Sequence, residues 1–169
     1  MMMDRELYEL GEQVGAALKK NELVLTTAES CTGGWIGEVV TMVSGSSAWY
    51  DRGFITYTNA AKQQMLGVKA LTLREHGAVS EPVVREMVAG ALAASRAHIA
   101  VSVSGVAGPT GGTADKPVGT VCIGWARKGV AAGTELRAET CHFDGDREAV
   151  RRQSVIRALQ GVLAMTRIN

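Results

Sequence analysis

The stretch LVLTTAESCTGGWIGEVVTMV, residues 23–43, contains the pattern that decides the fold. Its first part, Leu23 to Glu29, is a short run of apolar and β-branched residues and predicts a buried strand. Its second part, Cys31 to Val43, predicts a helix that follows directly. The stretch therefore predicts a strand-to-helix turn of an α/β protein.

Four further helices are expected, each with a residue suited to cap its first turn. The predicted caps are Asp4, Asn59, Ser80 and Asp144. The helix after Ser80 has the strongest start signal, because Pro82 lies in its first turn.

Strands are predicted at residues 53–59 and 98–105, and then consecutively at 119–126 and 135–143, with a hairpin through residues 128–133. The early strands alternate with helices, whereas the last two do not. We therefore expect an α/β fold: a three-layer α/β/α sandwich with a mixed, mostly parallel sheet of about five strands, at least one of them antiparallel.

Length and composition predict one domain spanning residues 1–169, of which 46% are hydrophobic. The formal net charge is +1 and neither sign forms a long block, so no nucleic-acid partner is expected. Residues 1–20 carry charges among their apolar positions and lack the pattern of a signal peptide. No apolar stretch approaches the roughly 18 residues needed to span a membrane. We expect a cytoplasmic protein with no membrane partner.

The chain has three cysteines, and their number and spacing fit neither a disulfide framework nor paired zinc ligands. Cys31, Cys122 and Cys141 are expected to be reduced thiols. No metal site is predicted.

Three candidate nucleophiles, Ser30, Cys31 and Thr32, lie at the predicted strand-to-helix turn. Free backbone N–H groups and the positive end of the helix dipole stabilise anions there. A serine at this place could attack an acyl group while the amides of Thr32, Gly33 or Gly34 hold the oxyanion. From this stretch alone, a capping role for Ser30 or Thr32 is favoured, because capping is the commoner use of these residues.

A nucleophilic serine needs a base, and the histidines do not provide an evident one. His76 lies in a predicted turn, His98 and His142 lie in or beside predicted strands, and no G-x-S-x-G motif surrounds the serine. Lys62 is the other option, at the third position of the helix expected after Asn59. The helix dipole would help to hold its amine neutral there. A solvated surface lysine is the alternative, and the spacing does not decide between them.

The segment SGVAGPTGG, residues 104–112, follows a predicted strand, as phosphate-binding loops do. It matches neither the Walker pattern nor the G-x-G-x-x-G pattern, so neither ATP nor NAD is implied. A long structural loop is the alternative. The residues that could present donors to an anionic ligand are Ser104, Gly105, Gly108, Thr110, Gly111 and Gly112.

Five segments together resemble one known family. They are TAESCTGGW (27–35), GSSAWYDRGFITYTNAAKQQMLGV (45–68), HGAVSE (76–81), SGVAGPTGG (104–112) and KPVGTV (116–121). In this order they resemble the CinA C-terminal domain family, whose stand-alone members are nicotinamide mononucleotide deamidases of the PncC type. The likeness spans about residues 7–163.

The resemblance implies an amidohydrolase that converts nicotinamide mononucleotide to nicotinic acid mononucleotide and ammonia, in pyridine nucleotide (NAD) recycling. It implies no metal or organic cofactor and suggests a homodimer. The family's nucleophilic serine falls on Ser30, its catalytic lysine on Lys62 and its active-site tyrosine on Tyr57. A non-catalytic nucleotide-binding regulatory module is the alternative from another class of function.

The expected substrate contacts combine the strand-to-helix turn, the glycine-rich loop and two arginines. The substrate phosphate would rest in the 104–112 loop or on the loop with Ser46 and Ser47, aided by a basic residue such as Arg147 or Arg151. The expected substrate-binding residues are Thr32, Gly33, Gly34, Ser46, Asn59, Ser104, Gly105, Gly108, Thr110, Gly111, Gly112, Arg147 and Arg151.

Overall fold

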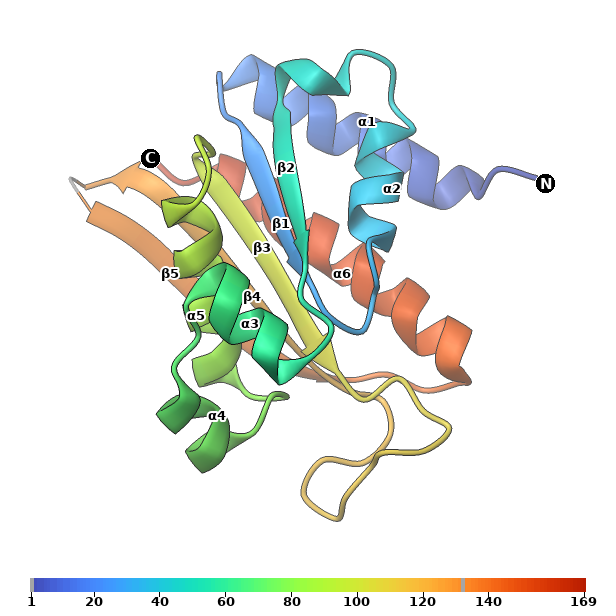
Figure 1. Cartoon of the computed structure of the whole chain (residues 1–169). Helices are drawn as coiled ribbons and strands as arrows, with labels where there is room; N and C mark the ends of the chain where they lie inside the picture. Colours follow the sequence, from blue (N-terminus) through green and yellow to red (C-terminus); the bar gives the residue numbers. More distant parts are fainter. Residues whose placement is uncertain (1, 132) are drawn as a thin grey trace.

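A five-stranded sheet in the order β2-β1-β3-β4-β5 forms the centre of the molecule (Figure 1). The computed structural model describes residues 2–131 and 133–169. β1 pairs in parallel with β2 and β3, whereas β4 is antiparallel to both β3 and β5. Four of the five strands therefore run in the same direction and only β4 is reversed. The strands are β1 (Leu25–Glu29), β2 (Tyr50–Ile55), β3 (Ile99–Gly105), β4 (Thr120–Val130) and β5 (Gly133–His142).

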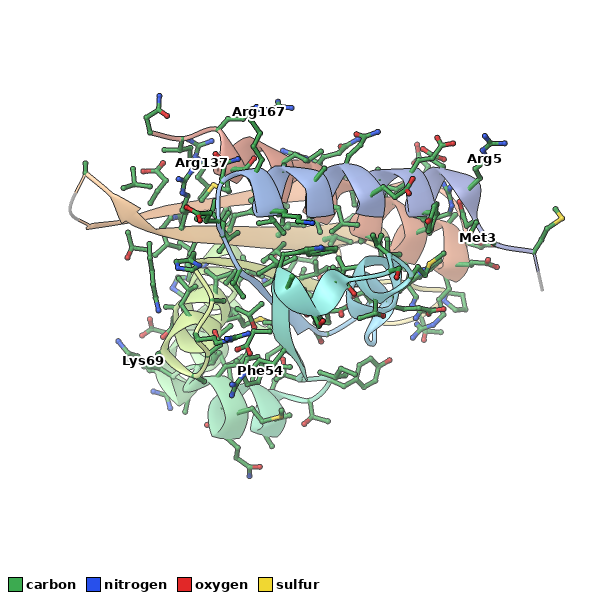
Figure 2. All side chains as sticks on the ribbon, turned by 90° about the horizontal axis from the view of Figure 1, so that it is seen from above. Met3, Arg5, Phe54, Lys69, Arg137 and Arg167 are labelled. Carbon is green, nitrogen blue, oxygen red and sulfur yellow. The ribbon has the colours of Figure 1, made fainter. Side chains whose placement is uncertain are left out.

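Helices cover both faces of this sheet, as Figures 1 and 2 show from two directions. α1, α2 and α6 lie on one face, and α3, α4 and α5 lie on the other. The predicted three-layer α/β/α sandwich with a mixed sheet is confirmed. The helices are α1 (Arg5–Lys20), α2 (Trp35–Thr41), α3 (Asn59–Leu66), α4 (Ala70–His76), α5 (Glu81–Ala93) and α6 (Arg147–Thr166), with a short 3₁₀ helix, η1 (Ser46–Ala48).

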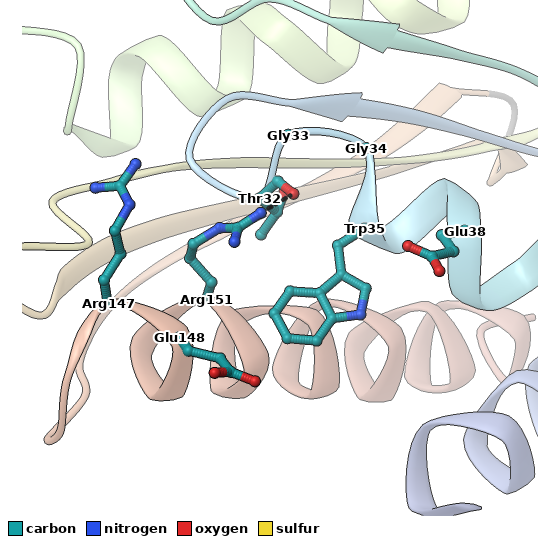
Figure 3. A pocket seen from close by; sticks show the side chains of 8 residues that line it. All are labelled: Thr32, Gly33, Gly34, Trp35, Glu38, Arg147, Glu148 and Arg151. Carbon is teal, nitrogen blue, oxygen red and sulfur yellow. Dashed lines mark hydrogen bonds between the residues drawn. The ribbon is translucent and has the colours of Figure 1, made fainter. Parts of the chain in front are cut away.

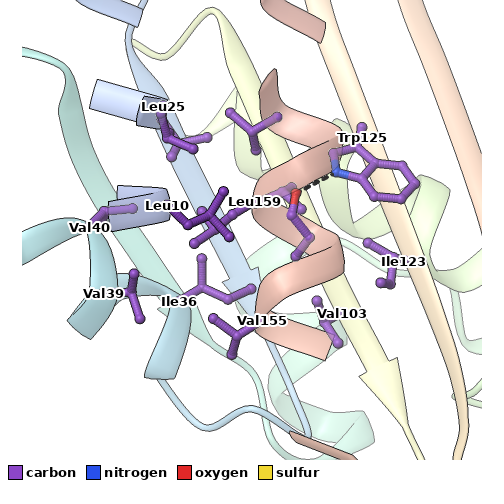
Figure 4. Packing of buried hydrophobic residues seen from close by; sticks show 14 of the residues in the cluster. Leu10, Leu25, Ile36, Val39, Val40, Val103, Ile123, Trp125, Val155 and Leu159 are labelled. Carbon is purple, nitrogen blue, oxygen red and sulfur yellow. Dashed lines mark hydrogen bonds between the residues drawn. The ribbon is translucent and has the colours of Figure 1, made fainter. Parts of the chain in front are cut away.

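The larger of the two cores lies between the sheet and the α1, α2 and α6 layer (Figure 4). Leu10, Ile36 and Leu159 bring one apolar side chain each from these three helices onto the buried strands. The indole Nε1 of Trp125 donates a hydrogen bond to the Ala158 carbonyl at 2.9 Å. A Cβ at Gly161 would lie 2.1 Å from that indole, so the glycine permits the close approach of α6. This packing fixes the position of α6 on the sheet.

Two of the four predicted caps are confirmed and two are wrong. Asp4 accepts from the Leu7 amide at 3.2 Å and Ser80 from the Val83 amide at 3.4 Å. α6 is capped by Asp146 instead of Asp144, because Asp146 has the extended backbone that a cap needs and accepts from the Ala149 amide.

Thr58, not Asn59, caps α3. Its hydroxyl accepts from the Ala61 amide at 3.1 Å, while the backbone of Asn59 is already helical. Lys62 consequently occupies the fourth helical position instead of the third, still within the first turn.

Some element boundaries also differ from the prediction. The helix expected from residue 31 begins only at Trp35, because Gly33 (φ 61°) and Gly34 (φ 103°) adopt left-handed conformations incompatible with a regular helix. The strand expected at 53–59 is β2, which starts and ends earlier and so leaves Tyr57 outside the sheet. Helix α4 was not predicted, and it contains His76, which was expected in a turn.

The hairpin expected through residues 128–133 is present, with β4 reaching Val130 and β5 starting at Gly133. Residue 132 lies outside the described part of the chain. In that described part, no helix combines the length and the apolar character needed to cross a membrane.

Candidate active site

Ser30 and Lys62, which lie 32 positions apart in the sequence, meet at the carboxyl end of β1. Ser30 directly follows the strand, and α3 brings the Lys62 Nζ to 3.1 Å from the Ser30 Oγ. The same nitrogen donates to the Thr56 carbonyl at 3.1 Å. Lys62 is only 2% exposed and Ser30 only 7%. The hydroxyl and the amine therefore form a buried hydrogen-bonded pair.

Burial decides the protonation of the groups around this pair. It lowers the pKa of the Lys62 amine, because the charged ammonium loses its hydration in the interior. A neutral amine can accept the hydroxyl proton of Ser30. Burial also raises the pKa of the neighbouring Cys31 thiol to about 12, so this thiol stays protonated. The environment favours Ser30 over Cys31 as the nucleophile.

A cavity of about 250 Å³ opens onto the pair. Polar groups from β3 and α3 line it beside the nucleophile, together with the ring of Tyr57. The lining residues are Ser30, Cys31, Tyr57, Asn59, Lys62, Ala78, Val79, Ser104, Gly105, Ala107 and Arg147. This cavity thus brings together the three predicted catalytic residues and four of the thirteen predicted substrate-binding residues, namely Asn59, Ser104, Gly105 and Arg147.

A second, wider cavity of about 540 Å³ adjoins the first, and Arg147 lines both. Figure 3 shows Arg147 and Arg151 extending from α6 toward the strand-to-helix turn. Arg147 donates to the Gly108 carbonyl at 2.8 Å and to the Tyr57 hydroxyl at 3.1 Å. Arg147 therefore connects the glycine-rich loop to the tyrosine. The wider cavity is lined by Thr32, Gly33, Gly34, Trp35, Glu38, Arg147, Glu148 and Arg151.

Glu29, which the sequence analysis did not single out, organises the turn that holds the nucleophile. Its carboxylate is 2% exposed and accepts hydrogen bonds from the Thr32 hydroxyl at 2.7 Å, the Ile36 amide at 2.9 Å and the Gly37 amide at 3.0 Å. Glu29 thus satisfies the second and third amides of α2, while the first, that of Trp35, donates to the Thr32 carbonyl. The capping role considered for Ser30 and Thr32 is wrong, because the Thr32 hydroxyl donates to Glu29 and neither side chain bonds an α2 amide.

The turn itself corrects one expectation about the oxyanion donors. The Gly33 amide donates to the Ser30 carbonyl at 3.0 Å, so this amide is already engaged. Arg151 donates to the carbonyls of Cys31 at 3.0 Å and Thr32 at 3.1 Å. Within residues 2–131 and 133–169, the amides of Cys31, Thr32 and Gly34 donate to no backbone carbonyl, so these three are the candidates to bind an oxyanion.

Three predicted loop contacts do not reach the Ser30 cavity. Thr110, Gly111 and Gly112 are exposed and do not line it. A Cβ at Gly112 would lie 2.8 Å from the Val118 amide nitrogen, so this glycine serves the folding of the loop. Gly108 contributes through its carbonyl to Arg147.

Ser46 is also separated from the site. It lies in η1, which Trp49 separates from β2. The Trp49 carbonyl accepts from the Leu25 amide, the first amide of β1. Ser30 follows the opposite end of β1. Within this chain, Ser46 therefore does not meet the nucleophile.

None of the three histidines lines the described surface of the Ser30 cavity. His98 lies just before β3, where its Nδ1 accepts from the Val24 amide at 3.0 Å. His142 lies at the end of β5 beside Thr120. In the described part of the chain, none of these histidines is therefore placed beside Ser30 to act as its base.

Known proteins share both the sequence and the fold of this chain. The CinA C-terminal domain model matches residues 7–166. The chain is 58% identical over 159 residues to a protein of Escherichia coli K12 named nicotinamide-nucleotide amidohydrolase PncC, covering 94% of each chain. A protein of the same name from Pseudomonas putida is 52% identical, with 92% of this chain and 94% of the relative covered.

Among solved structures, the competence/damage inducible protein CihA of Agrobacterium tumefaciens superposes with a TM-score of 0.92 at 40% identity, over 99% of both chains. Sequence and structure agree along nearly the full length of the chain. The chain therefore belongs to the CinA C-terminal domain family.

Proposed function

We propose that this chain hydrolyses the carboxamide of nicotinamide mononucleotide to nicotinic acid mononucleotide and ammonia, through an acyl-enzyme on Ser30. The observation that carries the reaction type is the buried contact of 3.1 Å between the Lys62 Nζ and the Ser30 Oγ. The substrate is inferred from the relatives named nicotinamide-nucleotide amidohydrolase. The product would return to NAD synthesis, which makes this a reaction of pyridine nucleotide recycling.

In the acylation step, the Ser30 Oγ attacks the carboxamide carbon while the neutral Lys62 amine takes the hydroxyl proton. The carbonyl oxygen becomes an oxyanion, for which the Cys31, Thr32 and Gly34 amides are the available donors. Collapse of the tetrahedral intermediate breaks the C–N bond, and Lys62 returns the proton to the leaving ammonia. Lys62 then activates the water that cleaves the ester and regenerates Ser30.

The two adjoining cavities suit the two ends of a nucleotide. The pyridine ring and its carboxamide would occupy the cavity of about 250 Å³, beside Tyr57 and the polar side chains of Asn59 and Ser104. Arg147 lines both cavities, so its guanidinium is placed to attract the phosphate of a substrate that extends into the wider one. We assign Arg147 this role.

A homodimer in the cytoplasm, in which the whole chain forms one domain, belongs to the same proposal. Ile55 and Tyr57 are 54% and 59% exposed beside the site, and a second copy could cover them. Light scattering tests the dimer directly: a monomeric mass at micromolar concentration would remove this part of the proposal.

Ammonia release from nicotinamide mononucleotide tests the function. The parent chain should release ammonia, whereas Ser30→Ala should not, while both should bind the nucleotide in calorimetry. Mass spectrometry of an acid-quenched reaction should show the acyl group on the peptide that contains Ser30. Binding without ammonia release by the parent would favour the alternative, a non-catalytic nucleotide-binding regulatory module.

A further inference from the structure

Arg151 reaches the nucleophile turn from α6, on the sheet face opposite to the helix that carries Lys62. Its Nε donates to the Cys31 carbonyl at 3.0 Å and its Nη2 to the Thr32 carbonyl at 3.1 Å. The guanidinium also lies 5.3 Å from the centroid of the Trp35 ring (Figure 3). The two carbonyls belong to the Cys31–Thr32 and Thr32–Gly33 peptide groups, the second and third after Ser30.

The contact with Cys31 fixes the direction of a neighbouring N–H. The Cys31–Thr32 peptide is trans, because the one cis bond among the described residues is Gly108–Pro109. A planar trans peptide points its N–H away from its carbonyl. With the carbonyl held toward α6, the Thr32 N–H points away from α6, toward the side from which Lys62 reaches Ser30.

The same contact changes the strength of that N–H as a donor. A cationic donor on a carbonyl polarises the peptide group, and hydrogen bonds in such a chain strengthen one another. The Nε of Arg151 therefore makes the Thr32 N–H a better donor. Its Nη2 acts likewise on the next peptide, whose Gly33 N–H holds the Ser30 carbonyl at 3.0 Å.

We propose that Arg151 is a positioning residue, which orients and polarises the Thr32 N–H as a donor to the oxyanion formed when Ser30 is acylated. This inference rests on the proposed acyl-transfer function. It is an alternative to the phosphate contact expected of Arg151 from the sequence, and it assigns the Nε and Nη2 of the guanidinium to the two carbonyls that they contact.

Arg157 offers a matched control on the same helix. The Arg157 guanidinium lies 5.1 Å from the centroid of the Trp125 ring, an arrangement like that of Arg151 and Trp35. Arg157 forms a salt bridge with Glu139, however, and does not contact the nucleophile turn. Arg157→Met therefore removes an equivalent arginine–tryptophan contact from α6 without touching the turn.

The test compares Arg151→Met and Arg151→Lys with this control in steady-state ammonia release. For Arg151→Met we expect kcat to fall by about 10²-fold, the lower range for loss of one oxyanion donor. The KM should change by less than about threefold, because an interaction made only in the transition state is removed. Arg151→Lys retains a cationic donor for one carbonyl, so it should recover part of kcat. Arg157→Met should leave kcat near the parental value.

A second measurement is the rate at which phenylmethanesulfonyl fluoride inactivates each variant. The Ser30 Oγ–S bond forms as fluoride leaves, Lys62 takes the hydroxyl proton, and a sulfonyl oxygen occupies the place of the oxyanion. This reagent has no phosphate, so slower inactivation of Arg151→Met, by a factor similar to its loss in kcat, would support the positioning role. The parent rate on this reagent also separates the two proposals. A parent that is inactivated at Ser30 but releases no ammonia refutes the proposed substrate, while the variants still test Arg151.

Two results would overturn the inference. A raised KM with unchanged kcat and unchanged inactivation would show that Arg151 binds the substrate phosphate. Equal effects of Arg151→Met and Arg157→Met on kcat, inactivation and melting temperature would show that Arg151 only stabilises α6.

Discussion

Replacing Glu29 by glutamine should destabilise the protein by about 2–4 kcal/mol. The carboxylate accepts three hydrogen bonds. Oε1 accepts two buried ones, from the Thr32 hydroxyl and the Ile36 amide, and Oε2 accepts a partly buried one from the Gly37 amide. A glutamine has one acceptor oxygen, and its NH₂ group would face at least one of these donors. Loss of a hydrogen bond to a charged group costs about 1.5–3 kcal/mol, and a buried donor left without an acceptor about 1–3 kcal/mol, two terms that partly overlap.

Urea and thermal denaturation measure this effect. For a chain of this length about 1 kcal/mol shifts the melting temperature by roughly 2–4 °C, so the glutamine variant should melt about 5–15 °C lower. Glu38→Gln is the matched control, because it makes the same chemical change at an exposed position of α2, the helix whose first turn Glu29 contacts. A Glu29→Gln variant within about 0.5 kcal/mol of this control would refute the conclusion that Glu29 holds the start of α2.

Three further predictions concern the catalytic pair and the loop. Ser30→Ala should abolish ammonia release but keep a nearly parental melting temperature, because Ser30 does not cap α2. Cys31→Ala should stay active, because the Cys31 thiol stays protonated. An active Ser30→Ala variant and an inactive Cys31→Ala variant would identify Cys31 as the nucleophile. Activity should rise with pH, with an apparent pKa below the ordinary lysine value of 10.5, because the neutral form of Lys62 is the base. Lys62→Arg should be nearly inactive, because a guanidinium stays protonated. An active arginine variant would require another base. Gly112→Val should lower the melting temperature without raising the KM, because the added side chain would clash with the Val118 backbone. A raised KM at parental stability would show that this part of the loop contacts the substrate.

The pKa of Lys62 also predicts how stability depends on pH. Its pKa is lower in the folded chain than in the unfolded chain, so between these two values the unfolded state binds more protons. The free energy of unfolding attributable to this group therefore increases as pH rises through the folded pKa, and it levels off near the ordinary lysine value. Lys62→Met should lose this dependence in denaturation experiments at several pH values.

The sequence predicted the alternation of strands and helices because apolar periodicity is a local property. Its errors lie where tertiary contacts decide between near-equivalent local choices. Asp144 and Asp146 flank Gly145, and either could cap a helix by type alone; the backbone conformation selects Asp146. Similarly, Thr58 and Asn59 are adjacent cap formers, and only the structure shows which of them is extended.

The candidate site was predicted in its chemical groups but not in its arrangement. Ser30 and Lys62 followed from the family resemblance, whereas their contact depends on how α3 packs beside the end of β1. Glu29 was missed because a glutamate at a strand end usually faces water, and its burial is a property of the assembled turn. A carboxylate that closes a fully buried strand and precedes a glycine-rich turn would have been the signal to notice.

The contact between Arg151 and the Cys31 carbonyl joins residues 120 positions apart, and this separation has a consequence for synthesis on the ribosome. Chains are made from the N-terminus at about 5–20 residues per second. The serine turn is therefore synthesised roughly 6–24 s before Arg151, which holds two of its carbonyls, is added. Once Lys62 has also been added, the nascent chain contains both Ser30 and Lys62, but without Arg151 the Ser30 hydroxyl should be slow to acylate. Acquisition of activity is thus tied to the translation of α6 and its docking on the sheet.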